Sequence, residues 1–290
     1  MFCLENPSTL SSFLELFADP SQTILIDELK AMRLLANNRI GVDSSAGQSI
    51  ELSAVTTTFL EGVERTRLKS LDEATDLFLQ VIQTLIQDSS QGDYPKQACM
   101  LHAMALNNLG YISQRKGEFD DAVIAFSDAL SMLDEPTGEA GNGQPSSSTS
   151  TESHEEDLAL ALIYCNAGRI GFIEGNYEQA ELLLSRGEDL LVRSTQRNDP
   201  NYTNELGHQS AESCFLRSLI RHSLTHVFLD LGEFQKGESM FVLTLDDVSH
   251  AINAYTQGRH NVRIHNEFLN QCISSITTSV QVALSLHAVE

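Results

Sequence analysis

Apolar side chains recur along most of this chain at intervals of three and four residues, which is the spacing of amphipathic helices. The helical runs come in pairs, and a short polar break separates the two runs of each pair. The pairs occupy residues 55–88, 103–136, 161–194 and 218–251. This pattern predicts an all-α fold of antiparallel helix hairpins, in which the first helices of the last two pairs reach about twenty residues each.

Small residues at fixed places explain how the two helices of a pair can pack closely. In the pair at 103–136, Gly110 lies on the first helix, Gly117 follows its end, and Ala122 lies on the second helix. A left-handed residue that ends a helix costs little only for glycine, so Gly117 is predicted to hold the turn. Gly110 and Ala122 are predicted to face each other at closest approach. Phe126 is predicted to fill the space toward the next hairpin.

The other pairs keep this pattern with substitutions. The pair at 161–194 retains both glycines, as Gly168 and Gly175. The pair at 218–251 matches the pattern moderately, since Thr225 replaces the first glycine. The pair at 55–88 is the weakest, since Lys69 replaces the second glycine.

Together these positions resemble the tetratricopeptide repeat (TPR) family, whose repeats are about 34 residues long. Residues 103–136 carry the most complete set of matching positions. That set is Leu106, Leu109, Gly110, Gly117, Phe119, Ala122, Phe126 and Ala129. The resemblance implies a TPR-like α-solenoid with elongated helices, whose first helices line a concave groove that binds a partner segment. The chain departs from the family in spacing, because long insertions separate its repeats.

The remaining sequence frames the repeats. Residues 1–50 form an N-terminal helical and irregular segment, in which residues 22–38 are predicted to be an amphipathic helix. The repeats extend over residues 51–258. The insertion at 134–157 is rich in Ser, Thr, Gly and acidic residues, which is the composition of a flexible linker. Residues 259–290 are predicted to form a C-terminal capping helix.

Charge narrows the range of partners. The chain has 290 residues and a net charge of −22, and such a surface repels nucleic-acid phosphates and anionic lipids. We therefore expect no nucleic-acid partner. Residues 268–289 lack charged side chains apart from His287, but they hold too many Asn, Gln, Ser and Thr for membrane insertion. Five isolated cysteines predict free thiols in a reducing compartment, for which we expect the cytoplasm, with the nucleus also open.

Motifs for catalysis do not occur in this sequence, which has no HExxH, no phosphate-binding glycine loop and no GxSxG. His222 and His226 are four residues apart on one helix face, a spacing that can bind a metal, but no nearby acid or cysteine completes a site. We therefore expect no cofactor, no metal and no enzyme activity. A helical enzyme with an unrecognised site is the remaining alternative of this class.

The TPR resemblance places a set of candidate groove residues on the first helices. They are Asn107, Asn108, Tyr111, Arg115, Asn166, Arg169, Arg217, Arg221, His222 and His226. Asn108 and Asn166 fall at the same repeat position, where an amide can bond a peptide backbone through both donor and acceptor. The arginines suit the carboxylates of an extended, partly acidic peptide. The alternative is that they offset local acid on solvated faces, or pair with Glu174 and Glu178.

These observations favour a non-catalytic scaffold or adaptor whose partner is another protein, bound as an extended or helical segment in the groove. The alternative is a regulatory or structural subunit of a larger assembly, docking through the uncharged C-terminal helix. Ser153 lies three residues before Glu156, a spacing that suits an acid-directed kinase, so it is a candidate phosphorylation site. The alternative there is an unregulated linker.

Overall fold

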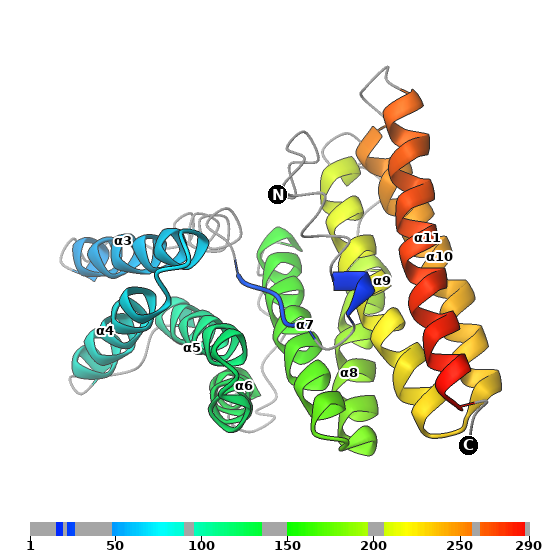
Figure 1. Cartoon of the computed structure of the whole chain (residues 1–290). Coiled ribbons are helices and arrows are strands. Elements are labelled where there is room, and N and C mark those ends of the chain that lie inside the picture. Colours follow the sequence, from blue (N-terminus) through cyan, green and yellow to red (C-terminus); the bar gives the residue numbers. More distant parts are fainter. Residues whose placement is uncertain are drawn as a thin grey trace, which may run out of the picture. The chain divides into compact units, whose positions relative to one another are not determined.

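The computed structural model describes residues 16–19, 22–26, 48–89, 96–134, 150–196, 206–256 and 262–287. All regular secondary structure within these residues is helical, which confirms the predicted all-α class (Figure 1). The main helices are α3 (Gln48–Arg67), α4 (Leu71–Ser89), α5 (Lys96–Lys116), α6 (Phe119–Asp134), α7 (Ser150–Ile173), α8 (Tyr177–Gln196), α9 (Leu206–Asp230), α10 (Phe234–Thr256) and α11 (Val262–His287).

Helices α3 to α10 pair in chain order as hairpins, at the places where the sequence predicted pairs. The first helices of the later hairpins are long, with 24 residues in α7 and 25 in α9, which confirms their predicted elongation. Neighbouring hairpins also pack on one another, since α4 contacts α5 and α8 contacts α9. Helix α11 follows the last hairpin and contacts both α9 and α10.

A left-handed residue closes the turn of each hairpin, with φ between 62° and 81° at Lys69, Gly117, Gly175 and Gly232. At Gly117 the backbone N–H donates to the Gln114 carbonyl at 3.0 Å, and the next N–H donates to the Ser113 carbonyl at 2.9 Å. This pair of bonds satisfies carbonyls that the helix end would otherwise leave free. Lys69 makes the same turn without being glycine.

Close packing inside a hairpin depends on the glycine of the first helix. A Cβ atom on Gly110 would lie 2.8 Å from the Phe126 ring, and one on Gly168 would lie 2.5 Å from Leu184. Phe126 therefore packs against its own hairpin, whereas the sequence was interpreted as directing it toward the next one. In the last hairpin Thr225 replaces the first glycine, and the small residue lies on the second helix as Gly237. A Cβ there would meet the Thr225 carbonyl oxygen at 3.5 Å.

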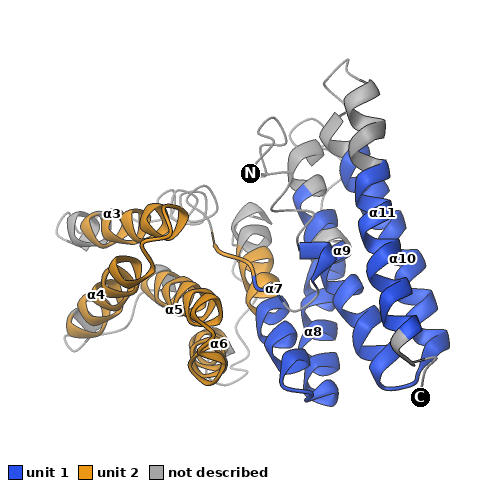
Figure 2. Cartoon of the chain, viewed as in Figure 1, with its two compact units in different colours: residues 1–23, 164–290 blue, residues 24–163 orange. Residues whose placement is uncertain are grey.

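The described chain divides into two compact units (Figure 2). The C-terminal unit comprises Met1–Thr23 and Tyr164–Glu290, and the N-terminal unit comprises Ile24–Ile163. The sequence predicted a single series of repeats over residues 51–258, whereas the division falls within α7. Each unit is built from hairpins and has its own buried apolar side chains.

Two predicted boundaries differ from the structure. Residues 22–26 are not helical, so the helix predicted over 22–38 is wrong for these five residues, and 27–38 lie outside the described part. The insertion predicted over 134–157 overlaps two helices, because α6 ends at Asp134 and α7 begins at Ser150.

Candidate functional site

In the N-terminal unit, α5 holds a short extended stretch of the chain's own N-terminal region. The Asn108 side chain accepts the Ile26 N–H through Oδ1 at 2.9 Å and donates from Nδ2 to the Ile26 carbonyl at 3.1 Å. The Nδ2 atom of Asn107 donates to the Ile24 carbonyl at 3.4 Å. Asn107, Asn108, Ile24 and Ile26 are all buried, whereas Leu25 between the two isoleucines is half-buried. We call this set of contacts the α5 anchor.

In the C-terminal unit, Arg169 of α7 binds the preceding part of the same region. Its Nη1 donates to the Gln22 carbonyl and its Nη2 to the Leu16 carbonyl, at 3.2 Å, while Nε donates to Ser223 Oγ at 2.9 Å. The side chain is 0% exposed. Burial lowers the pKa of this guanidinium, and the nearby Cys165 and Asp19 act against that shift. A buried cation is therefore held largely by main-chain carbonyls.

His222 of α9 completes what we call the α7–α9 anchor, which consists of Arg169, His222 and Ser223 with residues 16–19, 22 and 23. His222 Nε2 lies 2.8 Å from the Phe17 carbonyl oxygen. A carbonyl only accepts, so Nε2 carries the proton of the neutral ring. Its Nδ1 is then a buried acceptor with no hydrogen-bond partner among the described residues. Burial, His226 and Arg169 hold the His222 pKa well below its usual range.

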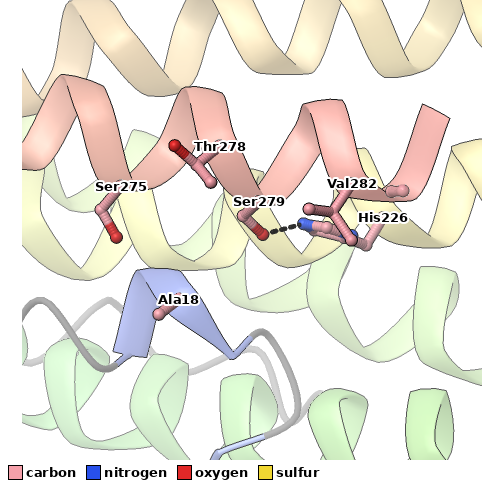
Figure 3. A pocket seen from close by; sticks show the side chains of 7 residues that line it. Ala18, His226, Ser275, Thr278, Ser279 and Val282 are labelled. Atoms are coloured by element: carbon pink, nitrogen blue, oxygen red, sulfur yellow. Dashed lines mark hydrogen bonds between the residues drawn. The ribbon is translucent and has the colours of Figure 1, made fainter. Parts of the chain in front are cut away.

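His226 lies one turn further along α9, beside a pocket of about 420 Å³ (Figure 3). The pocket is lined by Ala18, His226, Ser275, Thr278, Ser279, Val282 and Ala283. His226 Nε2 is 2.9 Å from Ser279 Oγ on α11. Burial and the charge of Arg169 lower the His226 pKa to about 4, against a smaller opposite effect of Asp19. Such an imidazole is a weak base at neutral pH, so the pair is better explained as a buried imidazole that bonds to a half-buried hydroxyl.

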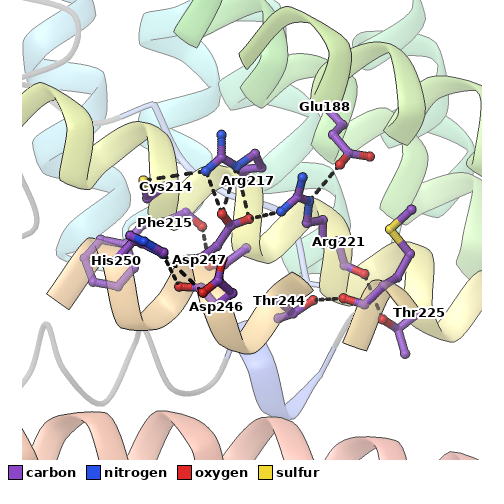
Figure 4. A network of polar contacts seen from close by, with 12 residues as sticks. Glu188, Cys214, Phe215, Arg217, Arg221, Thr225, Thr244, Asp246, Asp247 and His250 are labelled. Atoms are coloured by element: carbon purple, nitrogen blue, oxygen red, sulfur yellow. Dashed lines mark hydrogen bonds and ion pairs between the residues drawn. The ribbon is translucent and has the colours of Figure 1, made fainter. Parts of the chain in front are cut away.

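The arginines of α9 have a different role (Figure 4). The Asp247 side chain of α10 is 2% exposed. Its carboxylate forms ion pairs with Arg217, whose Nη2 lies 2.6 Å from Oδ1, and with Arg221, whose Nη1 lies 2.8 Å from Oδ2. Arg221 also reaches Glu188 of α8 at 2.7 Å. Burial alone would lower the Arg217 pKa, but the hydrogen bonds and charge of Asp247, with Cys214 and Glu188, raise it. Both guanidinium groups thus join helices of one unit, and their acid partners are not the predicted Glu174 and Glu178.

The other predicted residues are dispersed. Asn166 is buried on α7, Tyr111 is half-buried on α5, and the Arg115 guanidinium lies 5.3 Å from the Tyr111 ring centroid. Ser153 falls within α7, but its side chain lies outside the described part. Of the ten predicted groove residues, the two anchors therefore contain Asn107, Asn108, Arg169 and His222.

The sequence did not indicate that residues 16–19 and 22–26 contact the helices of the two anchors. Leu16, Phe17, Ile24 and Ile26 are buried in a region that was interpreted as a flanking segment. Their signal was present as short apolar runs on either side of Pro20, but nothing local indicated which helix they contact.

Comparisons of this chain with family models, with curated proteins and with solved structures find no match. Among the described residues, no helix is long and apolar enough to cross a membrane. In that same part of the chain, no group of three or more His, Cys, Asp or Glu side chains is placed to hold a metal ion.

Proposed function

We propose that this chain is a non-catalytic protein-interaction scaffold or adaptor of TPR type, which binds a segment of another protein on its first helices. The observation that carries the proposal is the pair of hydrogen bonds between the Asn108 side-chain amide and the backbone of Ile26. That geometry recognises an extended main chain whatever its side chains are. A location in the cytoplasm or nucleus, which we expect from the free thiols, is compatible with such a role.

Two further features support binding over catalysis. The polar groups of the anchors are already bonded to main chain, so they act as recognition groups and not as reactive ones. The net charge of −22 disfavours a nucleic-acid partner. Main-chain hydrogen bonds and the burial of apolar side chains are enough to bind a protein segment, so this class of ligand fits the anchors.

The test is site-specific photo-cross-linking in native cell extract. A photoreactive residue replaces Tyr111, half-buried on the first helix α5, or Ile124, exposed on the second helix α6. We expect covalent adducts with another protein from position 111 and not from position 124. Equal adducts from both positions, or none from either, would contradict binding on the first helices.

A second candidate is docking into a larger assembly through α11. Val282 and Leu284 of this helix are 55% and 43% exposed, and no side chain from residue 270 to 285 is charged in a chain of net charge −22. An uncharged exposed stripe avoids the repulsion that the remaining surface would exert on an acidic partner. A photoreactive residue at position 284 tests it in the same experiment, and adducts from this position alone would favour the assembly subunit.

A further inference from the structure

The turn between α3 and α4, in the N-terminal unit, carries a basic sequence that neither the hairpin packing nor the anchors use. Residues 65–70 read RTRLKS, so arginines stand five and three positions before Ser70, and a lysine stands directly before it. Among all serines and threonines of the chain, Ser70 is the only one with an arginine three positions before it. In a chain of net charge −22, this local basic spacing distinguishes Ser70 from every other hydroxyl.

Arginines at such places are what a basophilic protein kinase requires of its substrate. The kinase pairs each guanidinium with carboxylates of its own substrate cleft, and charge patterns of this kind decide which serine it accepts. Acidic segments are repelled by the same cleft, so most of this chain is a poor substrate for that class of kinase. The basic stretch must also be accessible, because a kinase binds its substrate as an extended chain.

The side chains of residues 64–70 meet this requirement. Only Thr66 among them is buried, and the others are exposed or half-buried. Leu68 is 63% exposed, and Ser70 is half-buried. A kinase that approaches Ser70 therefore meets basic side chains at the surface of the unit.

An extended conformation of this stretch requires only the last turn of α3 to open. The packing of α3 on α4 lies before it, where the Phe59 and Phe78 ring centroids are 5.3 Å apart and a Cβ on Gly62 would lie 2.9 Å from Phe78. Opening gives up backbone bonds of the turn, such as the one from the Ser70 N–H to the Arg65 carbonyl at 3.0 Å, and ion pairs that are exposed to solvent. Both losses are small compared with unfolding the hairpin.

We propose that Ser70 is a phosphorylation site, reached through opening of the last turn of α3, for a protein kinase that selects arginines three and five positions before its target. The Ser70 hydroxyl oxygen forms a bond to the γ-phosphorus of a nucleoside triphosphate, and the bond from that phosphorus to the leaving diphosphate breaks. The hydroxyl proton passes to the catalytic base of the kinase. Modification of Ser70 is independent of the proposed scaffold role.

The phosphorylated turn is compatible with the fold because two cations already reach it. Arg65 Nη1 lies 2.9 Å from Glu73 Oε2, and Lys116 Nζ of α5 lies 2.6 Å from Asp72 Oδ1. A phosphoserine carries about −1.5 to −2 charges at pH 7 and is a stronger acceptor than a carboxylate. We expect a phosphate on Ser70 to compete with these two acids for the cations, so the added charge finds partners without unfolding α4.

Phosphate transfer to the full-length chain tests the proposal, with ATP and the purified catalytic domain of a kinase that requires arginine at these two positions. Mass spectrometry maps the site, and radiolabelled ATP gives the initial rate. We expect one phosphate, on Ser70, and none on Ser153, which precedes acids. Both Ser70→Ala and Arg67→Ala should lower the rate about tenfold or more, since one removes the acceptor and the other a guanidinium pair. Arg115→Ala, an exposed arginine of the same unit, is the matched control and should leave the rate unchanged.

A synthetic peptide of residues 63–75 separates recognition of the sequence from access to the turn. It cannot hold the turn closed, so it should be phosphorylated faster than the folded chain. Lys69→Gly removes the cost of a left-handed lysine and favours the closed turn, so it should slow the chain about fivefold relative to the same change in the peptide. A peptide that accepts phosphate while the folded chain does not would overturn the proposal. So would a rate that is independent of Arg67, or one that Lys69→Gly changes equally in chain and peptide.

Discussion

The two units use the same hairpin but bury different polar chemistry in it. In the N-terminal unit, the α5 anchor consists of neutral amides, Asn107 and Asn108. The C-terminal unit buries Arg169, two imidazoles, and an ion-pair network centred on Asp247. Electrostatics and pH should therefore affect the second unit more than the first, in which His102 is a buried imidazole whose pKa burial lowers.

The difference also shows that arginines at similar positions on first helices need not share a role. Arg169 faces residues of the N-terminal region, whereas Arg217 and Arg221 face acids of α8 and α10. What separates them is the presence of an acid on the neighbouring helix. A guanidinium that meets a buried carboxylate joins two helices by an ion pair, and one that meets only carbonyls and a hydroxyl holds the neighbouring main chain, as Arg169 does.

The largest expected effect comes from removing the carboxylate at the centre of the network. Asp247→Ala leaves Arg217 and Arg221 without their shared partner and should lower the free energy of unfolding by about 3–5 kcal/mol. Asp246→Ala is the matched control, since this neighbour is 63% exposed, and it should cost no more than about 0.5 kcal/mol. Urea unfolding followed by circular dichroism measures both, and equal losses would contradict a buried network.

In the N-terminal unit, Asn108→Ala should cost less, about 2 kcal/mol, because it leaves the buried N–H and carbonyl of Ile26 without partners but strands no charge. The loss should be the same at pH 7 and pH 5, since no ionisable group takes part in these bonds. Arg115→Ala, an exposed change on the same helix, is the control and should cost about 0.5 kcal/mol or less. A loss that changes with pH would break the contrast between the units.

Acid should destabilise the C-terminal unit through His226. The unfolded ring takes up a proton near its ordinary pKa of 6.5, whereas the folded ring does so only near 4. The unfolded state thus binds more protons between these values, and stability is lost as pH falls through them. From pH 7 to pH 5 this should lower the free energy of unfolding by about 2 kcal/mol.

Three neighbouring groups set the size of this acid response. The folded His222 pKa is also lowered, so His222 adds loss in the same direction, and Arg169 contributes to both shifts. Asp19 acts against the shift of His226. The variant His226→Gln keeps a polar side chain beside Ser279 and should reduce the pH dependence. Urea midpoints at the two pH values measure it, and an undiminished slope in the variant would assign the acid response to other groups.

The hairpins were predictable from sequence because their contacts are local. Gly110 faces Phe126 of the next helix, and Gly117 bonds to Gln114 of the preceding turn, so spacing alone predicts the close approach and the turn. The anchors were not predictable in the same way, because His222 and Phe17 are separated by 205 positions. The helix predicted over 22–38 is wrong at residues 22–26, where backbone bonds to α5 hold an extended chain that local propensity does not indicate.

The role of Asp247 was partly visible in the sequence. Asp247 shares the buried face of α10 with Thr244, Val248 and Ala251, at intervals of three and four residues. An acid on an otherwise apolar stripe requires a cation on the facing helix, which would have assigned Arg217 and Arg221 to the hairpin. The adjacent Asp246 is 63% exposed, so helical phase distinguishes the buried acid from its exposed neighbour.

The smallest predicted effect compares the turns of the two units. Lys69 has φ of 62°, a conformation that costs a non-glycine residue about 1 kcal/mol, so Lys69→Gly should stabilise the N-terminal unit by up to about that amount. Gly175→Ala is the reciprocal change in the C-terminal unit. A Cβ there would meet no atom within 4 Å, so its cost of about 1 kcal/mol comes from the backbone alone. The two urea midpoints should shift in opposite directions, and a shift of the same sign would mean that the four turns are not equivalent.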